Sequence, residues 1–202
     1  MFWLTRDGSG LVPDPLTAIV SPRPIAWVTS HDGKGGRNLA PYSFFNAVAY
    51  APPQLVLASI GGKPDRAFGK DSLANILETG VFCVNIAGYE DREALNASSA
   101  AFPRETDEAA HLGLPTAPCR AIDGVRLADA PAALECVLTQ HIVLEGADNH
   151  LVVARIEAFH LRDDCITEEG RFDVTRYRPL TRLGYSDFAS IDSVFRMKRP
   201  KV

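Results

Sequence analysis

The chain has 202 residues, of which 46% are hydrophobic and 23% are charged. These proportions are typical of a soluble globular protein and exclude disordered, collagen-like and coiled-coil chains. The formal net charge of −4 argues against general nucleic-acid binding, because neutralising phosphates requires an excess of Lys and Arg. No stretch approaches the roughly 20 consecutive apolar residues of a membrane helix, and the N-terminus does not resemble a signal peptide. We therefore expect a cytoplasmic protein that binds neither nucleic acid nor membrane.

The most regular segments predict β-strands. Runs rich in β-branched and aromatic residues, bounded by turn-forming residues, predict strands over 24–30, 54–60 and 81–86. A polar, glycine-rich loop over 31–36 follows the first of them.

The clearest strand pair lies in the second half of the chain. Residues 134–144 and 151–160 are long and β-rich, and the turn-forming residues 145–149 join them. In the second strand one set of alternate residues is mostly apolar, which predicts that one face of it is buried.

Three short helices are predicted between these strands. Asp71–Thr79 begins at a good N-cap, Asp71, and stops at Gly80; the other two cover 91–97 and 106–112. Because the elements show no βαβ rhythm, they favour a mainly β (α+β) antiparallel barrel with helical insertions. We expect one domain over 1–202, with its core at about 15–189 and a tail over 190–202.

The four cysteines and five histidines show no spacing typical of a metal site. We expect the cysteines to be mostly buried, reduced thiols, and we expect no metal. The sequence also lacks the glycine patterns of Rossmann and P-loop nucleotide sites.

Two segments near the first strand combine rigidity with polar groups. Prolines on both sides of Arg23 fix an extended path that presents its side chain, although an ordinary surface Arg would fit the same pattern. In Asn38–Asn46 small polar residues alternate with three aromatic residues. Backbone amides there could bind a planar heterocycle, whereas a plain strand with core Phe44 and Phe45 is the structural alternative.

The helix that begins near Asp71 is a candidate anion site. Free backbone N–H groups and the positive end of the helix dipole favour an anion there. Lys70 adds a full charge and Ser72 a hydroxyl group, so a phosphate is the expected ligand. The alternative is a helix that Asp71 simply caps.

The order of four separated motifs resembles that of a known family. The runs RPIAWVTS, GRNLAPYSFFNAVAYAPP, KDSLANILETGVFCVNI and ALNASSAAFP are similar to those of the flavin reductase-like, FMN-binding split-barrel proteins, of flavin reductase or flavoredoxin type. The resemblance continues to about residue 189. It implies a six-stranded antiparallel split barrel with short flanking helices, and a homodimer with FMN at the subunit interface.

The resemblance also implies which residues contact the cofactor. His160 matches a position near the nicotinamide, and no catalytic side chain is required. The implied FMN-binding residues are Arg23, Pro24, Tyr42, Ser43, Phe44, Phe45, Asn46, Lys70, Asp71, Ser72, Asn96, Ala97, Ser98, Ser99, Arg182 and Tyr185. The departure of Arg182–Asp187 from the usual glycine-rich turn leaves the choice between NADH and NADPH open.

The activity implied is an NAD(P)H:FMN oxidoreductase, in which the flavin carries the hydride chemistry and the protein positions it. Reduced flavin or electrons would pass to a partner such as a monooxygenase or another electron acceptor. Two alternatives remain open. One is an FMN-binding electron carrier that oxidises nicotinamides slowly, and the other is a related barrel with a different cofactor, such as pyridoxal phosphate or haem.

Overall fold

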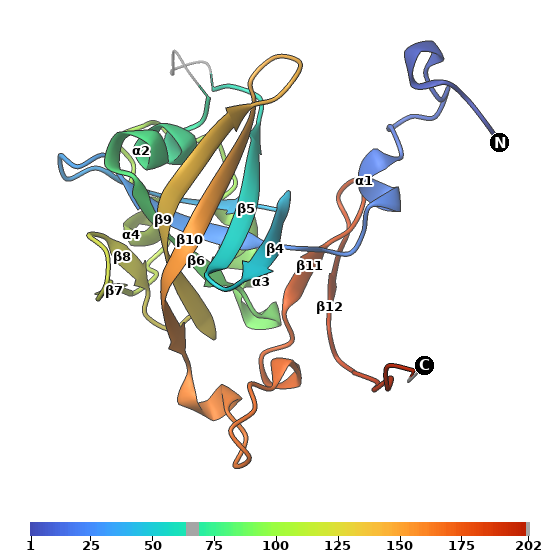
Figure 1. Ribbon diagram of the computed structural model, residues 1–202. Helices are drawn as coiled ribbons and strands as arrows, with labels where there is room; N and C mark the ends of the chain where they lie inside the picture. The colour runs from blue at the N-terminus through green and yellow to red at the C-terminus, as the bar shows by residue number, and fades with distance from the viewer. Residues whose placement is uncertain (64–68, 201–202) are drawn as a thin grey trace.

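The computed structural model describes residues 1–63 and 69–200. A seven-stranded antiparallel sheet with the order β3-β2-β6-β9-β10-β5-β4 dominates it (Figure 1). Its strands in chain order are β2 (Ala26–His31), β3 (Arg37–Tyr42), β4 (Phe45–Tyr50), β5 (Pro53–Ile60), β6 (Val81–Ile86), β9 (Ala132–Val143) and β10 (Asn149–Leu161). The expectation of six strands is therefore wrong by one, because the segment 38–46 divides at Ser43 and Phe44 into parts of β3 and β4.

The long hairpin of β9 and β10 bends the sheet. Its ladder shifts register between Val153 and Ala154 and again between Ile156 and Ala158, and such bulges increase twist and curvature. The curvature brings β3 towards β5, but among the described residues no hydrogen-bonded ladder joins β3 to either β4 or β5. The result is a barrel that is split along one side.

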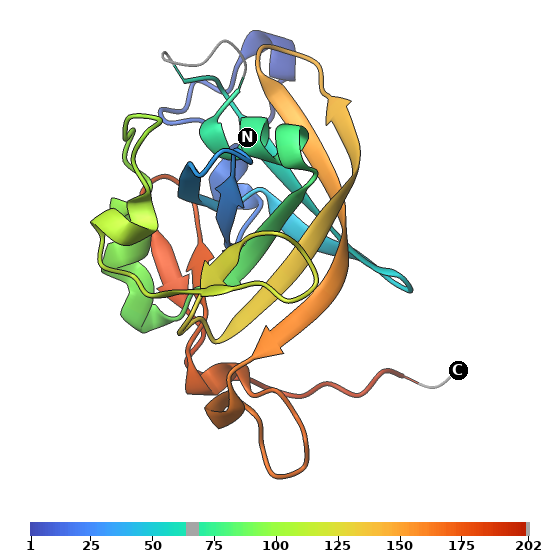
Figure 2. The same ribbon diagram turned by 90° about the vertical axis from the view of Figure 1, so that its left-hand side faces the viewer.

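The barrel interior holds the main hydrophobic core. Alternate residues of β10 point into it, and Val152 and Ala154 are fully buried, as the alternation in the sequence predicts. Helix α2 (Asp71–Thr79) packs against β2, β3 and β9 and contributes Leu73 and Ile76 to the same core. Figure 2 shows this helix near the upper end of the barrel.

A second apolar cluster lies outside the barrel and is centred on Trp27 and Leu39. The remaining short elements follow β6 or β10 in the chain. They are η2 (Tyr89–Asp91), α3 (Arg92–Ala97), α4 (Glu108–His111), β7 (Thr116–Pro118), β8 (Val125–Leu127), η3 (Asp163–Cys165) and η4 (Val174–Arg176).

Both ends of the chain leave the barrel together (Figure 1). They form a three-stranded sheet of β1 (Arg23–Pro24), β11 (Leu180–Arg182) and β12 (Phe188–Ser190). The N-terminal arm carries η1 (Thr5–Asp7) and α1 (Leu16–Ile19). Among the described residues, no helix approaches the length and apolar character that crossing a membrane requires.

Local sequence signals predict the bounds of two neighbouring elements correctly. The expected bounds of α2 and β6 are those observed, because Gly80 takes the left-handed conformation (φ 74°) that ends the helix between them. The cap differs from the expectation: the N-cap residue is Lys70, and Asp71 is the first helical residue. The predicted helix over 106–112 shrinks to α4.

Candidate functional site

The first turn of α2 is built to receive an anion. Its N-cap residue, Lys70, is extended and makes no side-chain cap hydrogen bond, and in the described ranges 1–63 and 69–200 no side chain accepts from the N–H groups of the first turn. First-turn N–H groups lack helical partners by geometry, so their donors and the positive end of the helix dipole point outward. The alternative reading, a helix capped by the Asp71 side chain, is therefore wrong.

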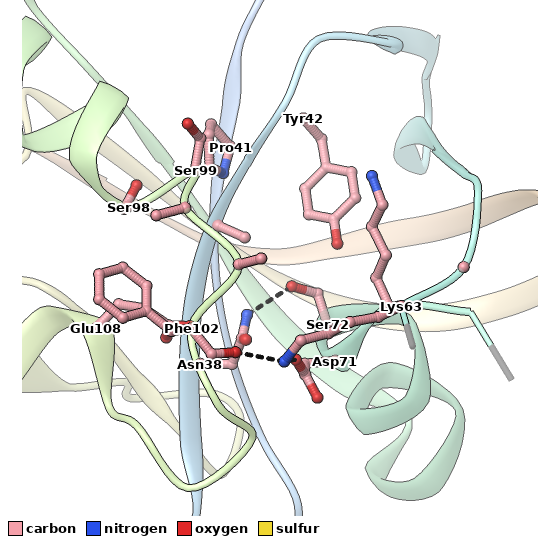
Figure 3. Close-up of a pocket in the computed structure, with 15 residues that line it drawn as sticks. Asn38, Pro41, Tyr42, Lys63, Asp71, Ser72, Ser98, Ser99, Phe102 and Glu108 are labelled. Atoms are coloured by element: carbon pink, nitrogen blue, oxygen red, sulfur yellow. Dashed lines mark hydrogen bonds and ion pairs between the residues drawn. The ribbon is translucent and has the colours of Figure 1, made fainter. Parts of the chain in front are cut away.

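A cavity of about 310 Å³ lies against this helix end (Figure 3). We call it the α2 cavity. Lys70, Asp71 and Ser72 line it on one side, and residues 98–102 after α3 line it on the other. Its full lining is Asn38, Ala40, Pro41, Tyr42, Gly62, Lys63, Lys70, Asp71, Ser72, Ser98, Ser99, Ala100, Ala101, Phe102 and Glu108. Segments far apart in sequence thus converge on one hollow.

Lys63 is the principal feature of the α2 cavity that the sequence does not predict. Its Nζ lies 2.6 Å from Oδ2 of Asp71, and both side chains are nearly buried, at 14% and 11% exposure. It also donates to the carbonyl of Phe102, which ties the wall after α3 to the helix end. In the sequence it follows Gly61 and Gly62 after the end of β5 and precedes Pro64, and this context does not indicate its contacts.

Hydrogen bonds fix the polar floor of the cavity. Asn38 Nδ2 donates to Ser72 Oγ at 2.7 Å, as Figure 3 shows. Burial is the largest influence on Tyr42 and raises the pKa of its phenol to about 12, with the nearby Asp71 acting in the same direction. The Tyr42 hydroxyl therefore stays protonated at neutral pH. Burial likewise raises the pKa of Glu108, which accepts from the Leu39 N–H.

A second cavity adjoins the first, and a third cavity adjoins the second. A central cavity of about 260 Å³ shares Pro41 and Ser99 with the α2 cavity. Its polar lining comes from Ser43, Asn96, Ser99 and Arg182, and its apolar lining from Ile25, Pro41, Leu95 and Phe188. Shared walls make these two cavities parts of one elongated groove.

The third cavity, of about 570 Å³, shares Asn96 and Phe188 with the central one. We call it the Tyr89 cavity, because the ring of Tyr89 forms part of its wall. Arg92 and Arg178 place their guanidinium carbons 4.3 and 4.4 Å from the centre of that ring. Arg182 stacks in the same way on Phe188, at 4.3 Å. Two aromatic rings and the Arg92 guanidinium therefore line this end of the groove, together with Glu93, Asn96, Leu180, Ser186, Ala189 and Ser190.

The groove gathers over half of the residues that the resemblance implies for FMN. It is lined by Tyr42, Ser43, Lys70, Asp71, Ser72, Asn96, Ser98, Ser99 and Arg182. The hydroxyls of Ser98 and Ser99 donate to backbone carbonyls of α3, so each is held in place by its own helix end.

The other implied residues do not line the groove. They are Arg23, Pro24, Phe44, Phe45, Asn46, Ala97, Tyr185 and His160. Phe45 packs on the barrel core, whereas Phe44 is 42% exposed. Asn46 accepts from the N–H of Ala47, and Tyr185 offers its backbone carbonyl to Arg182.

Arg23 fastens the two arms of the chain to each other. Its guanidinium donates to the carbonyls of Thr17 and Val20 in the N-terminal arm and to that of Leu183, at 2.8 Å, in the C-terminal arm. The side chain is buried, at 7% exposure. Three backbone carbonyls thus bind the Arg23 guanidinium in this structure, and its contact with the cofactor stays a prediction.

His160 is likewise committed elsewhere. Its Nε2 lies 2.5 Å from Oε1 of Glu135, which is completely buried. The same carboxylate accepts backbone N–H groups from Arg120, Ala121 and Ile122 at 2.6 to 3.1 Å. Burial alone would raise the pKa of Glu135, but these hydrogen bonds together lower it. His160 therefore supports a structural carboxylate in this chain.

The donor chemistry of the groove fits a flavin mononucleotide. The α2 cavity offers a helix N-terminus with no side-chain cap, together with Lys70 and Ser72, which suits a phosphate. The central cavity adds hydroxyl, amide and guanidinium groups beside apolar walls, which suits a polyol and a planar heterocycle.

Comparison with known proteins agrees with this chemistry. Residues 20–181 match the family described as Flavin reductase like domain. A protein of Halalkalibacterium halodurans is 32% identical over 93% of this chain and 90% of its own length. The crystal structure of Pseudomonas fluorescens 2-nitrobenzoate 2-nitroreductase NbaA is 34% identical, with a TM-score of 0.80 over 92% of this chain and 88% of that one.

A second solved structure is nitrilotriacetate monooxygenase component B from Bacillus cereus, which is 29% identical, with a TM-score of 0.83 over 94% of this chain and 100% of that one. Flavoredoxin of Desulfovibrio vulgaris shares the fold at 18% identity, with a TM-score of 0.78 over 95% of this chain and 97% of that one. The split-barrel architecture expected from the sequence is confirmed. The chain belongs to the flavin reductase-like domain family.

Proposed function

We propose that this protein is an NAD(P)H:FMN oxidoreductase that binds FMN along the groove. The observation that carries the proposal is the α2 cavity, where Lys70 and Ser72 lie at a helix end whose N-cap residue, Lys70, makes no side-chain cap hydrogen bond. A phosphate gains charge-assisted hydrogen bonds in such a place. The family match over 20–181 supports a flavin as the bearer of that phosphate.

Each part of the groove has a role in this proposal. Lys70, Ser72 and the first turn of α2 hold the phosphate, and Lys63 neutralises Asp71 beside it. Ser99 and Asn96 line the path from one cavity to the next and bind the ribityl chain. Ser43 and Arg182, which are far apart in the sequence, both line the central cavity and contact the ring system. Phe44, Phe45 and Asn46 directly follow Ser43 in the chain, and their contacts with FMN stay predictions.

The bound flavin supplies hydride acceptance at its ring, and the chain supplies position and charge. The Arg182 guanidinium, packed on Phe188, provides a cation for the negative charge that reduction adds. No side-chain acid or base is needed for a hydride step, which agrees with a groove where Glu108 accepts from the Leu39 N–H and Asp71 pairs with Lys63.

The Tyr89 cavity is the proposed site of the second substrate. It adjoins the central cavity through Asn96 and Phe188, so a ligand there lies beside the proposed ring position. Aromatic walls and guanidinium groups suit a planar ring that carries a negative group. A nicotinamide dinucleotide meets this description as the reductant.

The same cavity favours a second candidate, an aromatic electron acceptor. NbaA, at 34% identity, is named as a 2-nitrobenzoate 2-nitroreductase, and 2-nitrobenzoate is a planar ring with a carboxylate. We therefore propose that electrons pass either to an aromatic substrate in this cavity or, as reduced flavin, to a partner monooxygenase. A component B relative supports the second route. An electron carrier of flavoredoxin type is the remaining alternative.

We further propose that the functional unit is a homodimer. Large apolar side chains of the N-terminal arm and of β4 are exposed, among them Val12 at 96% and Tyr50 at 100%. An apolar surface of this kind marks an interaction site. Sedimentation of the FMN-loaded protein tests this point: a mass of one chain with FMN still bound would contradict it.

Anaerobic titration of the FMN-loaded protein with NADH tests the activity directly. We expect the visible absorbance of the flavin to bleach rapidly at stoichiometric NADH or NADPH. A flavin that stays oxidised with both reagents would instead indicate the electron carrier. Failure to load FMN would refute the proposed site.

A further inference from the structure

Away from the groove, two cysteines from distant parts of the chain are brought together. Cys83 lies in the middle of β6 and is buried. Cys119 follows β7 at the start of the loop 119–124 and is half-buried. The groove and the proposed reaction use neither of them.

Strands on both sides of Cys83 hold this loop. The Cα partners of Cys83 are Thr29 in β2 and Glu135 in β9, and cross-strand partners project from the same face of a sheet. Thr29 Oγ1 donates to the carbonyl of Val125 at 2.6 Å, and Glu135 Oε1 accepts from the N–H of Arg120 at 2.8 Å. The loop is therefore anchored on either side of Cys83.

Cys119 lies between the two anchors. It directly precedes Arg120, and its N–H donates to the carbonyl of Gly124, the neighbour of Val125, at 3.0 Å. Cys83 also lines one small cavity together with residues 122–124 of this loop, which places the loop beside it. The Cys119 thiol beside it, together with burial, raises the pKa of Cys83.

The other two cysteines are placed differently. Cys136 is part of the core inside the barrel, because it neighbours Glu135 in β9 and adjacent strand residues face opposite sides. Cys165 packs beside Arg162 and Asp164 near η3. In the described ranges 1–63 and 69–200, no cluster of His, Cys, Asp or Glu suited to a metal ion includes these thiols.

We propose that Cys83 and Cys119 form a redox-active pair, which hydrogen peroxide converts into an intrachain disulfide that fastens the loop 119–124 to β6. Peroxide reaches the half-buried Cys119 first. Its O–O bond breaks, the sulfur takes one oxygen as a sulfenic acid, and one water leaves. The Cys83 sulfur then displaces that oxygen, which leaves as a second water with the Cys83 proton. Two thiols are oxidised and one peroxide is reduced.

Peroxide treatment of the full-length, reduced protein tests this pairing. After one equivalent of hydrogen peroxide, free thiols are alkylated in denaturant and the peptides are mapped by mass spectrometry. We expect two of the four thiols to resist alkylation, with one linked peptide pair that contains Cys83 and Cys119. Dithiothreitol should restore all four, and a non-reducing gel should show no cross-linked dimer.

Single variants provide the controls. Cys119→Ser and Cys83→Ser should abolish the linked peptide, whereas Cys136→Ala should retain it. Oxidation should also raise the Tm of the wild type but not that of Cys119→Ser, because a disulfide restricts the unfolded chain. Irreversible oxidation of Cys119 with Cys83 still alkylated, or a linkage to Cys136 or between chains, would overturn the proposal. FMN binding does not enter this assay, so its result is independent of the proposed function.

Discussion

Two buried carboxylates, Asp71 and Glu135, have opposite roles in this molecule. Asp71 pairs with Lys63 at the edge of a cavity, where the end of α2 still offers donors. Glu135 accepts hydrogen bonds from His160 and three backbone N–H groups, with no exposed surface. The difference teaches that a charged pair marks a binding site only where donors are left over for a ligand. At Glu135 the available donors, His160 and three backbone N–H groups, are all bound to the carboxylate itself.

The largest expected effect comes from removing the Glu135 carboxylate. Glu135→Ala leaves three loop N–H groups and His160 without their acceptor, so we expect the free energy of unfolding to fall by about 3–5 kcal/mol. Urea denaturation measures it. Glu157→Ala, which breaks the pair with Arg155 on the same hairpin, is the control and should cost less than about 1 kcal/mol. Equal effects would remove the distinction between the two pairs.

Removing the donors at the end of α2 should affect binding rather than folding. Lys70→Ala with Ser72→Ala deletes charge-assisted phosphate contacts of about 1.5–3 kcal/mol, so the Kd for FMN should rise at least tenfold. Lys34→Ala removes the same charge at the other end of α2, where Lys34 pairs with Glu78, and should leave the Kd unchanged. Fluorescence quenching of FMN measures both. An unchanged Kd in the double variant would place the phosphate elsewhere.

The acid dependence of stability tests the hydrogen bonds of Glu135. The pKa of Glu135 is lowered below its usual value of 4.5, so its stabilising contribution is complete above that value and is lost as the pH falls through the folded pKa. Glu135→Gln should therefore flatten the loss of stability below about pH 4.5. Thermal melts from pH 3 to 7 measure this slope. A slope equal to that of the wild type would contradict the assigned hydrogen bonds.

A smaller effect is expected from Lys63. Lys63→Met removes the cation beside Asp71, and the carboxylate then repels the ligand phosphate, so the Kd for FMN should rise several-fold. Adding Asp71→Asn removes that repulsion and should restore part of the affinity. Titration of both variants gives the comparison. If the second substitution weakens binding further, Asp71 contacts the ligand favourably.

The smallest expected effect concerns His160. Because its imidazole is bound to Glu135, His160→Gln should change the rate of flavin reduction by less than about twofold, although it should lower the Tm. Stopped-flow reduction with NADH measures the rate. A loss of tenfold or more would return His160 to the nicotinamide side, as the family resemblance implies.

The sequence predicts what local signals determine. The ends of α2 and the start of β6 follow from Lys70 to Gly80, where the stop signal and the hydrophobic pattern agree. Pairings between distant segments carry no such signal: β11 and β12 have three residues each, and β1, the other partner of β11, lies near the other end of the chain.

In the candidate site, too, residues with a local sequence signal could be predicted, and residues whose partners are distant could not. Lys70 and Ser72 could be predicted to lie at the start of a helix, because a helix start is readable from sequence. Lys63 was missed because its partners, Asp71 and Phe102, become neighbours only in the fold. The family resemblance assigned Arg23 and His160 to the cofactor, and no pattern in the sequence reveals the backbone carbonyls and the buried carboxylate that these side chains bind.

The central claim is that the end of α2 binds the phosphate of the flavin. Isothermal titration with FMN and with riboflavin, which lacks the phosphate, tests it in the wild type and in Lys70→Ala/Ser72→Ala. We expect the wild type to prefer FMN by at least tenfold and the double variant to bind both alike. A wild type that does not discriminate, or a double variant that keeps the preference, would contradict the account.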